Sequence, residues 1–308
     1  MDRTVLITGV AGFIGRYVAQ YFSSQGWFVV GIDRASPENA PLSNVSSYYN
    51  LHLPSAAFHD LVQKHSPDVC IHSAGRSSVG FSMTEPSSDF YDSTVLTFEI
   101  LNVLRDRAPK CKFVLLSSAA VYGNPESIPV KETDLPAPIS PYGFHKWQSE
   151  QLCLEFSRVY DIPTTSLRLF SAYGPGLRRQ VLWDICQKIF IQKSIRLQGT
   201  GQESRDFIHA MDIARASTVV AARAPMRGEV YNVGSGQEVT IDELSRLILK
   251  ASGSDLSPEY DGIVPPGIPR NWKADSSKIA SLGFAPSIPL AEGVPSYVRW
   301  CHAEMFGI

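Results

Sequence analysis

A tyrosine and a lysine four residues apart could form an acid–base pair in this chain. The segment SPYGFHKWQSE has helical periodicity, so Tyr142 and Lys146 would share one face of a helix. A free tyrosine has a pKa of about 10 and is a poor base near neutrality, but a neighbouring ammonium group favours the phenolate. Tyr142 could then remove a proton from a substrate hydroxyl. A solvated helix face can carry the same pair by chance, so the hypothesis needs support from other motifs.

Two serines upstream of this pair end a predicted strand. The segment FVLLSSAAVYG places Ser117 and Ser118 where the strand meets the carboxyl edge of a sheet, and ligands of parallel α/β folds bind at that edge. Ser118 could hold the reacting oxygen atom. A serine at a strand end can equally be a turn or cap residue.

Three glycines near the N-terminus could form a phosphate-binding turn. In TVLITGVAGFIG, Gly9, Gly12 and Gly15 lie between an apolar run and a helical segment. A tight turn of this kind lets the backbone approach a pyrophosphate, and the helix N-terminus offers free N–H groups and a partial positive charge. The spacing differs from the commoner G-x-G-x-x-G pattern, so an ordinary strand-to-helix turn is the alternative.

The residue that ends the next predicted strand bears on the choice of cofactor. FVVGID ends in Asp33, whose carboxylate can accept hydrogen bonds from ribose hydroxyls and would repel a 2′-phosphate. This pattern favours NAD over NADP. Arg34 favours the opposite choice, because a guanidinium at this position could pair with a 2′-phosphate.

The order of elements predicts an α/β fold with a doubly wound parallel sheet, the Rossmann arrangement. Short apolar runs alternate with helical segments such as 90–107 and 142–160. The predicted strands are TVLITG, FVVGID, DVCIHSAG, KFVLLSS and PTTSLRLF. Loops rich in Gly and Pro dominate after about residue 171, as in DGIVPPGIPRNW. We therefore predict a cofactor-binding domain at 1–170 and a smaller, loop-rich substrate domain at 171–308, with a possible return to the first domain around 206–236.

Composition narrows the class of partner. The net charge of −2 and pI near 6.4, without a long basic run, argue against nucleic acid or an anionic membrane as a partner. No apolar segment is long enough to cross a bilayer, and the N-terminus lacks the pattern of a signal peptide, so we expect a soluble, cytoplasmic protein that binds a small molecule. The five cysteines form no CxxC pair and the seven histidines no HxH or HExxH cluster, so we expect neither disulfides nor a metal site.

Six motifs together resemble the extended short-chain dehydrogenase/reductase family, specifically its NAD-dependent nucleotide-sugar epimerase/dehydratase branch. In chain order they are TGVAGFIG, IHSAG, SSAAVYG, SPYGFHK, LRLFSAYGPG and RDFIHAMDIA, and they extend over nearly the whole sequence. The resemblance implies NAD as cofactor, a nucleotide sugar as substrate, and an active site between the two domains. It also implies a homodimer paired through the helices at 90–107 and 142–160.

The resemblance assigns roles to individual residues. Tyr142 would be the base, Lys146 would bind the nicotinamide ribose, and Ser118 would assist at the substrate. The implied cofactor contacts are Gly9, Gly12, Phe13, Ile14, Gly15, Asp33, Arg34, Ala74, Gly75, Tyr142, Lys146 and Phe170. The implied substrate contacts are Val79, Ser118, Ser171, Arg205 and Arg270, of which Arg205 would pair with the diphosphate.

Three positions depart from the family pattern. Ser171 stands where many members have Asn, and alignment places Ser93 where a helix usually begins with Asn, which leaves substrate contacts there open. Arg270 is the nearest candidate for a second phosphate contact, with an ordinary surface arginine as the alternative.

The residues after Ser118 discriminate between the reactions of the family. The 4,6-dehydratases place an Asp-Glu pair there to move protons at C6 and C5, whereas this chain has Ala119 and Ala120. C4 epimerisation through a 4-keto intermediate is therefore favoured. Reduction of a 4-keto-6-deoxysugar is the alternative, ahead of a dehydratase or a non-catalytic dinucleotide sensor.

Overall fold

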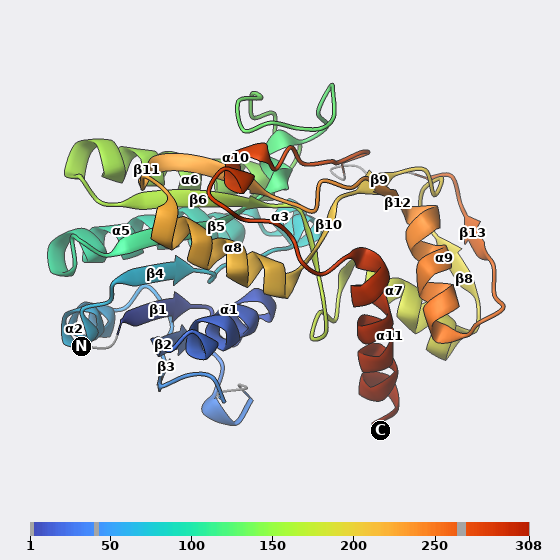
Figure 1. The fold of residues 1–308 in the computed structure, drawn as a ribbon, viewed down its shortest axis with the longest axis horizontal. Helices are drawn as coiled ribbons and strands as arrows, with labels where there is room; N and C mark the ends of the chain where they lie inside the picture. The colour runs from blue at the N-terminus through green and yellow to red at the C-terminus, as the bar shows by residue number, and fades with distance from the viewer. Residues whose placement is uncertain (1–2, 40–42, 264–268, 308) are drawn as a thin grey trace.

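A seven-stranded parallel sheet forms the centre of the larger layer of the protein (Figure 1). The computed structural model describes residues 3–39, 43–263 and 269–307. Every strand pair in this sheet is parallel. In spatial order the strands are β11 (Arg227–Val233), β6 (Thr164–Leu169), β5 (Lys112–Ser118), β4 (Val69–His72), β1 (Thr4–Thr8), β2 (Phe28–Asp33) and β3 (Ser47–Asn50). The predicted doubly wound α/β fold is confirmed.

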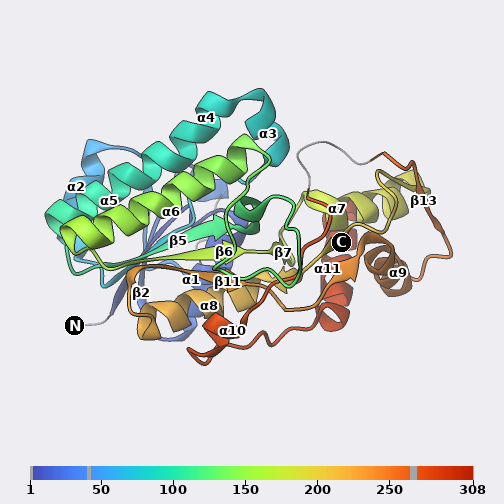
Figure 2. The same cartoon turned by 90° about the horizontal axis from the view of Figure 1, so that it is seen from above.

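Helices cover both faces of the sheet, which explains why its central strands are apolar on both sides (Figure 2). One face carries α1 (Phe13–Ser24) and α8 (Ala210–Arg223), which pack on each other, with the short α10 (Ser277–Ala280) next to β11. The other face carries α2 (Ala56–His65), α5 (Leu96–Arg107) and α6 (Pro141–Tyr160). The carboxyl ends of the strands are left open to the rest of the molecule.

All five predicted strands exist as β1, β2, β4, β5 and β6. The helix predicted at 90–107 is more complex, because α4 (Pro86–Phe90) runs through a π-helical turn, η2 (Tyr91–Val95), into α5. Before them lies the short α3 (Val79–Thr84). Such π-helical turns are rare in proteins, and many of those known lie at functional sites.

The chain returns to the sheet late. β11 pairs with β6 and α8 packs on α1, so the segment from α8 to β11 lies with the N-terminal elements. Where the boundary between two domains falls stays a prediction.

A second apolar cluster lies beyond the carboxyl ends of the strands (Figures 1 and 2). Buried side chains such as Leu182, Ile248 and Tyr297 hold its elements together. Its helices are α7 (Gln180–Gln187) with the π-helical η4 (Lys188–Gln192), α9 (Ile241–Ser252) and α11 (Leu290–Phe306). Its strands form two-stranded sheets: β7 (Ser171–Tyr173) with β10 (Phe207–His209), β9 (Ser204–Arg205) with β12 (Val239–Thr240), and β8 (Ile195–Leu197) with β13 (Pro258–Tyr260). The loop predicted at 261–272 lies partly outside the described residues.

Two further expectations concern cysteines and membranes. All five cysteines are free and buried, as small core residues are. In the part of the chain that the structure describes, no helix has the length and apolar character needed to cross a bilayer.

Candidate active site

The turn between β1 and α1 is packed so tightly that only glycine fits at two of its positions. Gly9 has φ +70°, and a Cβ built on it would lie 2.7 Å from the Cα of Ala74 at the end of β4. A Cβ on Gly15 would lie 2.1 Å from the carbonyl oxygen of Gly9. The glycine spacing therefore reflects backbone crowding, which brings the N-terminus of α1 to the carboxyl edge of the sheet.

The N-terminus of α1 fits a pyrophosphate. Gly12 is its N-cap and has no side chain to accept a hydrogen bond from the first turn, which starts at Phe13 and Ile14. The first N–H groups of a helix have no intrahelical partner and favour an anion. The residues present thus fit a dinucleotide, whose phosphates this turn would hold.

Asp33 is fixed at the end of β2, next to the glycine turn. Its Oδ2 accepts a hydrogen bond from Ala11 N at 3.0 Å, and its Oδ1 accepts one from Ala35 N at 3.0 Å. Arg34 is exposed and forms no ion pair within the described residues. Asp33 and not Arg34 is therefore held against the turn, in agreement with the preference predicted for NAD.

The first turn of α6 positions Tyr142 at the same edge. Ser140 is the N-cap, with its hydroxyl accepting a hydrogen bond from Gly143 N, and Pro141 is the first helical residue. Tyr142 N donates to Ser82 Oγ at 3.1 Å. A Cβ on Gly143 would lie 2.6 Å from the carbonyl oxygen of Ala120, so α6 starts in close contact with the segment after β5.

The environment of Tyr142 pulls its pKa in both directions. Burial raises the pKa of the phenol, and the negative charge of Asp89 raises it further. A hydrogen bond with Ser118 and the positive charge of Arg179 lower this pKa. Tyr142 is therefore a phenol at neutral pH unless more positive charge arrives next to it.

Lys146 lies one helical turn after Tyr142 and is buried. Its Nζ donates to the carbonyl oxygen of Leu116 at 3.1 Å and lies 5.9 Å from the centroid of the Tyr142 ring. Burial lowers the pKa of Lys146 to about 8, while the negative charges of Asp89 and Glu150 act in the opposite direction. The lysine is mostly an ammonium ion at neutral pH and loses its proton above about pH 8.

Ser118 ends β5 and starts the short 3-10 helix η3 (Ala119–Tyr122), where its Oγ accepts a hydrogen bond from Ala120 N at 3.1 Å. Ser118 caps η3 and also forms a hydrogen bond with Tyr142, so a cap residue and a residue of the active site are compatible roles for this serine. Ala119 and Ala120 are buried beside it. One apolar cluster around the tyrosine contains Ala119, Ala120, Tyr122, Val130, Tyr142, Phe170, Trp272 and Ala274, with Val79 and Ile128 packed against it.

The predicted substrate residues approach this cluster from the opposite side. Arg205 Nη1 donates to the carbonyl oxygens of Ser204, at 2.7 Å, and Arg270, at 2.9 Å, and its guanidinium lies 5.6 Å from the centroid of the Trp272 ring. Burial lowers the pKa of Arg205 to about 10, so it remains charged. It forms no ion pair within the described part of the chain, which leaves its charge available to an anion. The side chain of Arg270 is exposed, and Ser171 starts β7.

The remaining predicted residues lie at the same edge. Ala74 and Gly75 follow β4, next to the glycine turn, and Phe170 follows β6. A Cβ on Gly75 would lie 4.0 Å from Lys146 Nζ. The structure thus brings the cofactor candidates and the Tyr142–Lys146 pair together at one edge of the sheet. Ser93 is buried in η2, and its hydroxyl has no hydrogen-bond partner within the described residues.

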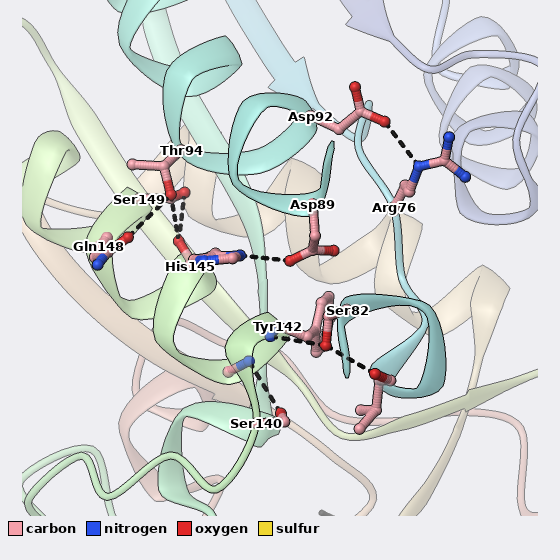
Figure 3. Close-up of polar contacts among 12 residues, drawn as sticks. Arg76, Ser82, Asp89, Asp92, Thr94, Ser140, Tyr142, His145, Gln148 and Ser149 are labelled. Atoms are coloured by element: carbon pink, nitrogen blue, oxygen red, sulfur yellow. Dashed lines mark hydrogen bonds and ion pairs between the residues drawn. The ribbon is translucent and has the colours of Figure 1, made fainter. Parts of the chain in front are cut away.

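Sequence reasoning missed three features of this site. Arg179, in the loop after β7, donates to Ser77 Oγ at 2.5 Å and so connects the far side to the loop after β4. Trp272 Nε1 donates to the carbonyl oxygen of Gly123 at 3.0 Å. His145 and Asp89 form a pair behind the tyrosine (Figure 3). The sequence offered only weak signals for these features. They were two adjacent arginines after a strand, a lone tryptophan in a polar loop, and a histidine directly before Lys146.

The dinucleotide cradle and the buried Tyr142–Lys146 pair, both at the carboxyl edge of a parallel sheet, define a Rossmann-fold protein of the dehydrogenase type. The sequence pattern of the NAD dependent epimerase/dehydratase family matches residues 5–234, and the chain belongs to this family. The resemblance predicted from the six motifs is therefore confirmed, as is NAD as the cofactor.

Similar proteins extend over nearly the full chain. A probable UDP-glucuronate 4-epimerase of Rhizobium meliloti is 29% identical, with 96% of each chain covered. The structure of a UDP-glucose 4-epimerase from Thermotoga maritima with UDP-glucose has a TM-score of 0.89 at 27% identity, covering 98% of this chain and 99% of that one. A UDP-glucuronic acid 4-epimerase from Bacillus cereus, in complex with UDP-glucuronic acid and NAD, has a TM-score of 0.88 at 26% identity, with 98% and 99% covered.

We predict that Gly15→Ala weakens NAD binding by about tenfold or more, since its methyl group would meet the carbonyl oxygen of Gly9 and open the turn. Calorimetric titration with NAD measures the effect. Gly80→Ala is the matched control, because a Cβ there meets nothing within 4 Å. An unchanged affinity in Gly15→Ala would show that the crowded turn does not hold the cofactor.

Proposed function

We propose that this protein interconverts two C4-epimeric UDP-linked sugars through a 4-keto intermediate, with NAD as a recycled cofactor. The observation that carries the proposal is the buried Tyr142–Lys146 pair with the half-buried Ser118 beside it, at the sheet edge where the glycine turn and Asp33 also lie. The UDP-sugar 4-epimerases among its relatives support the substrate class.

Proton transfer falls to Tyr142. Its phenolate takes the proton of the sugar O4 hydroxyl while the C4–H bond breaks and the C4 carbonyl forms, and the phenol returns the proton when the hydroxyl is restored. NAD, when bound, supplies the hydride acceptor at C4 and a positively charged ring that favours the phenolate. Ser118 hydrogen-bonds to the reacting oxygen. The Lys146 ammonium contacts the nicotinamide ribose and stabilises negative charge on Tyr142.

Binding of the nucleotide part falls to the opposite side of the site. The half-buried guanidinium of Arg205 has carbonyl partners and no carboxylate partner within the described residues, so it suits the diphosphate. Arg270 reaches the same place through its carbonyl oxygen, and its exposed side chain would give a second phosphate contact. Val79 and Ser171 would border the sugar.

The residues after Ser118 separate epimerisation from dehydration. Elimination of water needs an acid and a base near C5 and C6 of the sugar. The two residues that follow Ser118 are Ala119 and Ala120, whose buried methyl groups can serve as neither. Asp33, fixed next to the turn, supports a bound NAD over an NADPH that is consumed in each turnover.

The test is a panel of UDP-, GDP-, CDP- and dTDP-sugars. We expect a C4 epimer from at least one UDP-sugar, with no net consumption of added cofactor, measured by chromatography of the products and by the absorbance of reduced cofactor. Stoichiometric oxidation of NADPH by a 4-keto sugar, with no epimer from any saturated sugar, would replace the epimerase by a reductase. Absence of turnover despite NAD binding would favour a sensor.

Tyr142→Phe serves as the control variant for this panel. Loss of a single hydroxyl should lower kcat by about a hundredfold or more, with the fold and NAD affinity retained. Near wild-type turnover in this variant would exclude Tyr142 as the base.

We also propose a homodimer formed through α4, α5 and α6. These adjacent helices expose apolar side chains that a monomer gains nothing by exposing: Phe90, Phe98, Phe144, Val159 and Tyr160. Light scattering coupled to size-exclusion chromatography should give twice the chain mass, and Phe98→Glu with Val159→Glu should give the monomer. A monomeric wild-type protein at high micromolar concentration would contradict the dimer. A cytoplasmic location stays a prediction.

A further inference from the structure

A buried carboxylate lies behind the proposed catalytic pair, and no lysine or arginine of the described ranges pairs with it. Asp89, on α4, is fully buried, and its Oδ2 is 2.6 Å from His145 Nδ1 on α6 (Figure 3). Its Oδ1 has no hydrogen-bond partner in the described part of the chain. Carboxylates are almost never fully buried unless they are paired, so this one calls for an explanation.

The position of the pair along α6 is informative. His145 directly precedes Lys146 and follows Tyr142 by three residues, so a residue that holds His145 also holds the turn that carries both. The Thr94 hydroxyl donates to the carbonyl oxygen of His145 at 3.2 Å, and the Phe90 ring packs edge-on against its imidazole at 5.4 Å. The elements from α3 to η2 therefore grip the first turns of α6 from one side.

A second carboxylate near Lys146 is already neutralised. Glu150 is buried, but its Oε2 is 2.7 Å from Arg168 Nη2, and its Oε1 accepts a hydrogen bond from Ser117 at 2.6 Å. Among the described residues, the carboxylate of Asp89 has His145 as its only partner. Of the two, Asp89 is the carboxylate whose charge acts on the catalytic pair with less compensation, in surroundings where burial weakens screening.

Other ionisable groups also face this region. On α6 they are Tyr142, His145, Lys146 and Glu150; on the other elements they are His72 at the end of β4, Glu85 before α4, Asp92 on η2 with its partner Arg76, and Arg179 after β7. Glu85 is exposed, and Asp92 is paired with Arg76 at 2.9 Å and partly solvated. Of the three acidic residues in this part of the chain, Glu85, Asp89 and Asp92, Asp89 is the one that is fully buried.

We propose that Asp89, held by His145, is a positioning residue that places a fixed negative charge behind Tyr142 and Lys146 and so sets the pH range in which they transfer protons. The inference rests on the proposed roles of these two residues. The structure supports it electrostatically, because the charge of Asp89 raises the pKa of both Tyr142 and Lys146. The negative charge of Asp89 keeps the buried lysine protonated to a higher pH. It also moves formation of the Tyr142 phenolate to a higher pH.

The test is the pH profile of Asp89→Asn. Loss of a negative charge makes every neighbouring acid easier to deprotonate, so phenolate formation and loss of the lysine proton both move to lower pH. We expect the acidic and alkaline limbs of kcat/KM to move together by about half a unit or more. A fall in kcat with both limbs in place would indicate a purely structural role and overturn the proposal.

Three further variants test whether the shift of the pH profile comes from the charge of Asp89. Asp92→Asn removes the same charge one helical turn later and should move the limbs by less than half as much; an equal shift would overturn the proposal. Asp89→Glu keeps the charge and should restore the wild-type limbs. If Asp89→Asn does not fold, Asp89→Ser removes the charge with a smaller side chain, and its comparison with Asp89→Glu carries the test.

A readout without turnover separates this inference from the proposed function. Phenolate formation at Tyr142 can be followed by ultraviolet absorbance of the NAD-bound protein, as the difference from Tyr142→Phe. The same shift to lower pH is expected in Asp89→Asn. An unshifted titration would overturn the role of Asp89 even if the protein epimerises sugars, whereas a shifted titration with no active sugar would leave it standing and refute the epimerase.

Discussion

The site depends on the burial of two ionisable side chains on one helical turn. Tyr142 is part of an apolar cluster and Lys146 is buried one helical turn later, so charge on either group is costly. Burial lowers the pKa of Lys146 to about 8 and raises the pKa of Tyr142, so in the protein alone the ammonium loses its proton at a lower pH than the phenol does. Formation of the phenolate near neutral pH therefore requires additional positive charge next to Tyr142, and a positively charged cofactor ring would supply it.

The rest of the fold brings the proposed cofactor-binding and substrate-binding groups to the sheet edge where Tyr142 and Lys146 lie. The crowded backbone at Gly9 and Gly15 delivers the N-terminus of α1 to the same edge, and the N-cap Ser140 starts α6 there. Because all strands of the main sheet are parallel, the ends of β1, β4 and β5 meet at one edge, where cofactor and substrate can share a boundary. Arg205, on β9, brings a positive charge to the same region, with its guanidinium 5.6 Å from the centroid of the Trp272 ring.

Sequence reasoning recovered what has a short-range signature. The apolar runs predicted the central strands, and glycine spacing with Asp33 predicted the cofactor turn, since both depend on local backbone requirements. Asp89 and His145 escaped because they lie 56 residues apart and neither is unusual alone. Trp272 and Arg179 escaped for a similar reason: their roles depend on how loops after different strands fold back, which no periodicity encodes. The π-helical turn before α5 has no sequence signal that we recognise.

In the proposed reaction, one hydrogen leaves C4 of the sugar as hydride and returns to the same carbon, while Tyr142 removes and returns the proton on O4. A UDP-sugar substrate carrying deuterium at C4, converted in ordinary water and analysed by NMR and mass spectrometry, tests this claim most directly. We expect the epimer to keep its deuterium at C4. Loss of the label to solvent, or its appearance at another carbon, would contradict it.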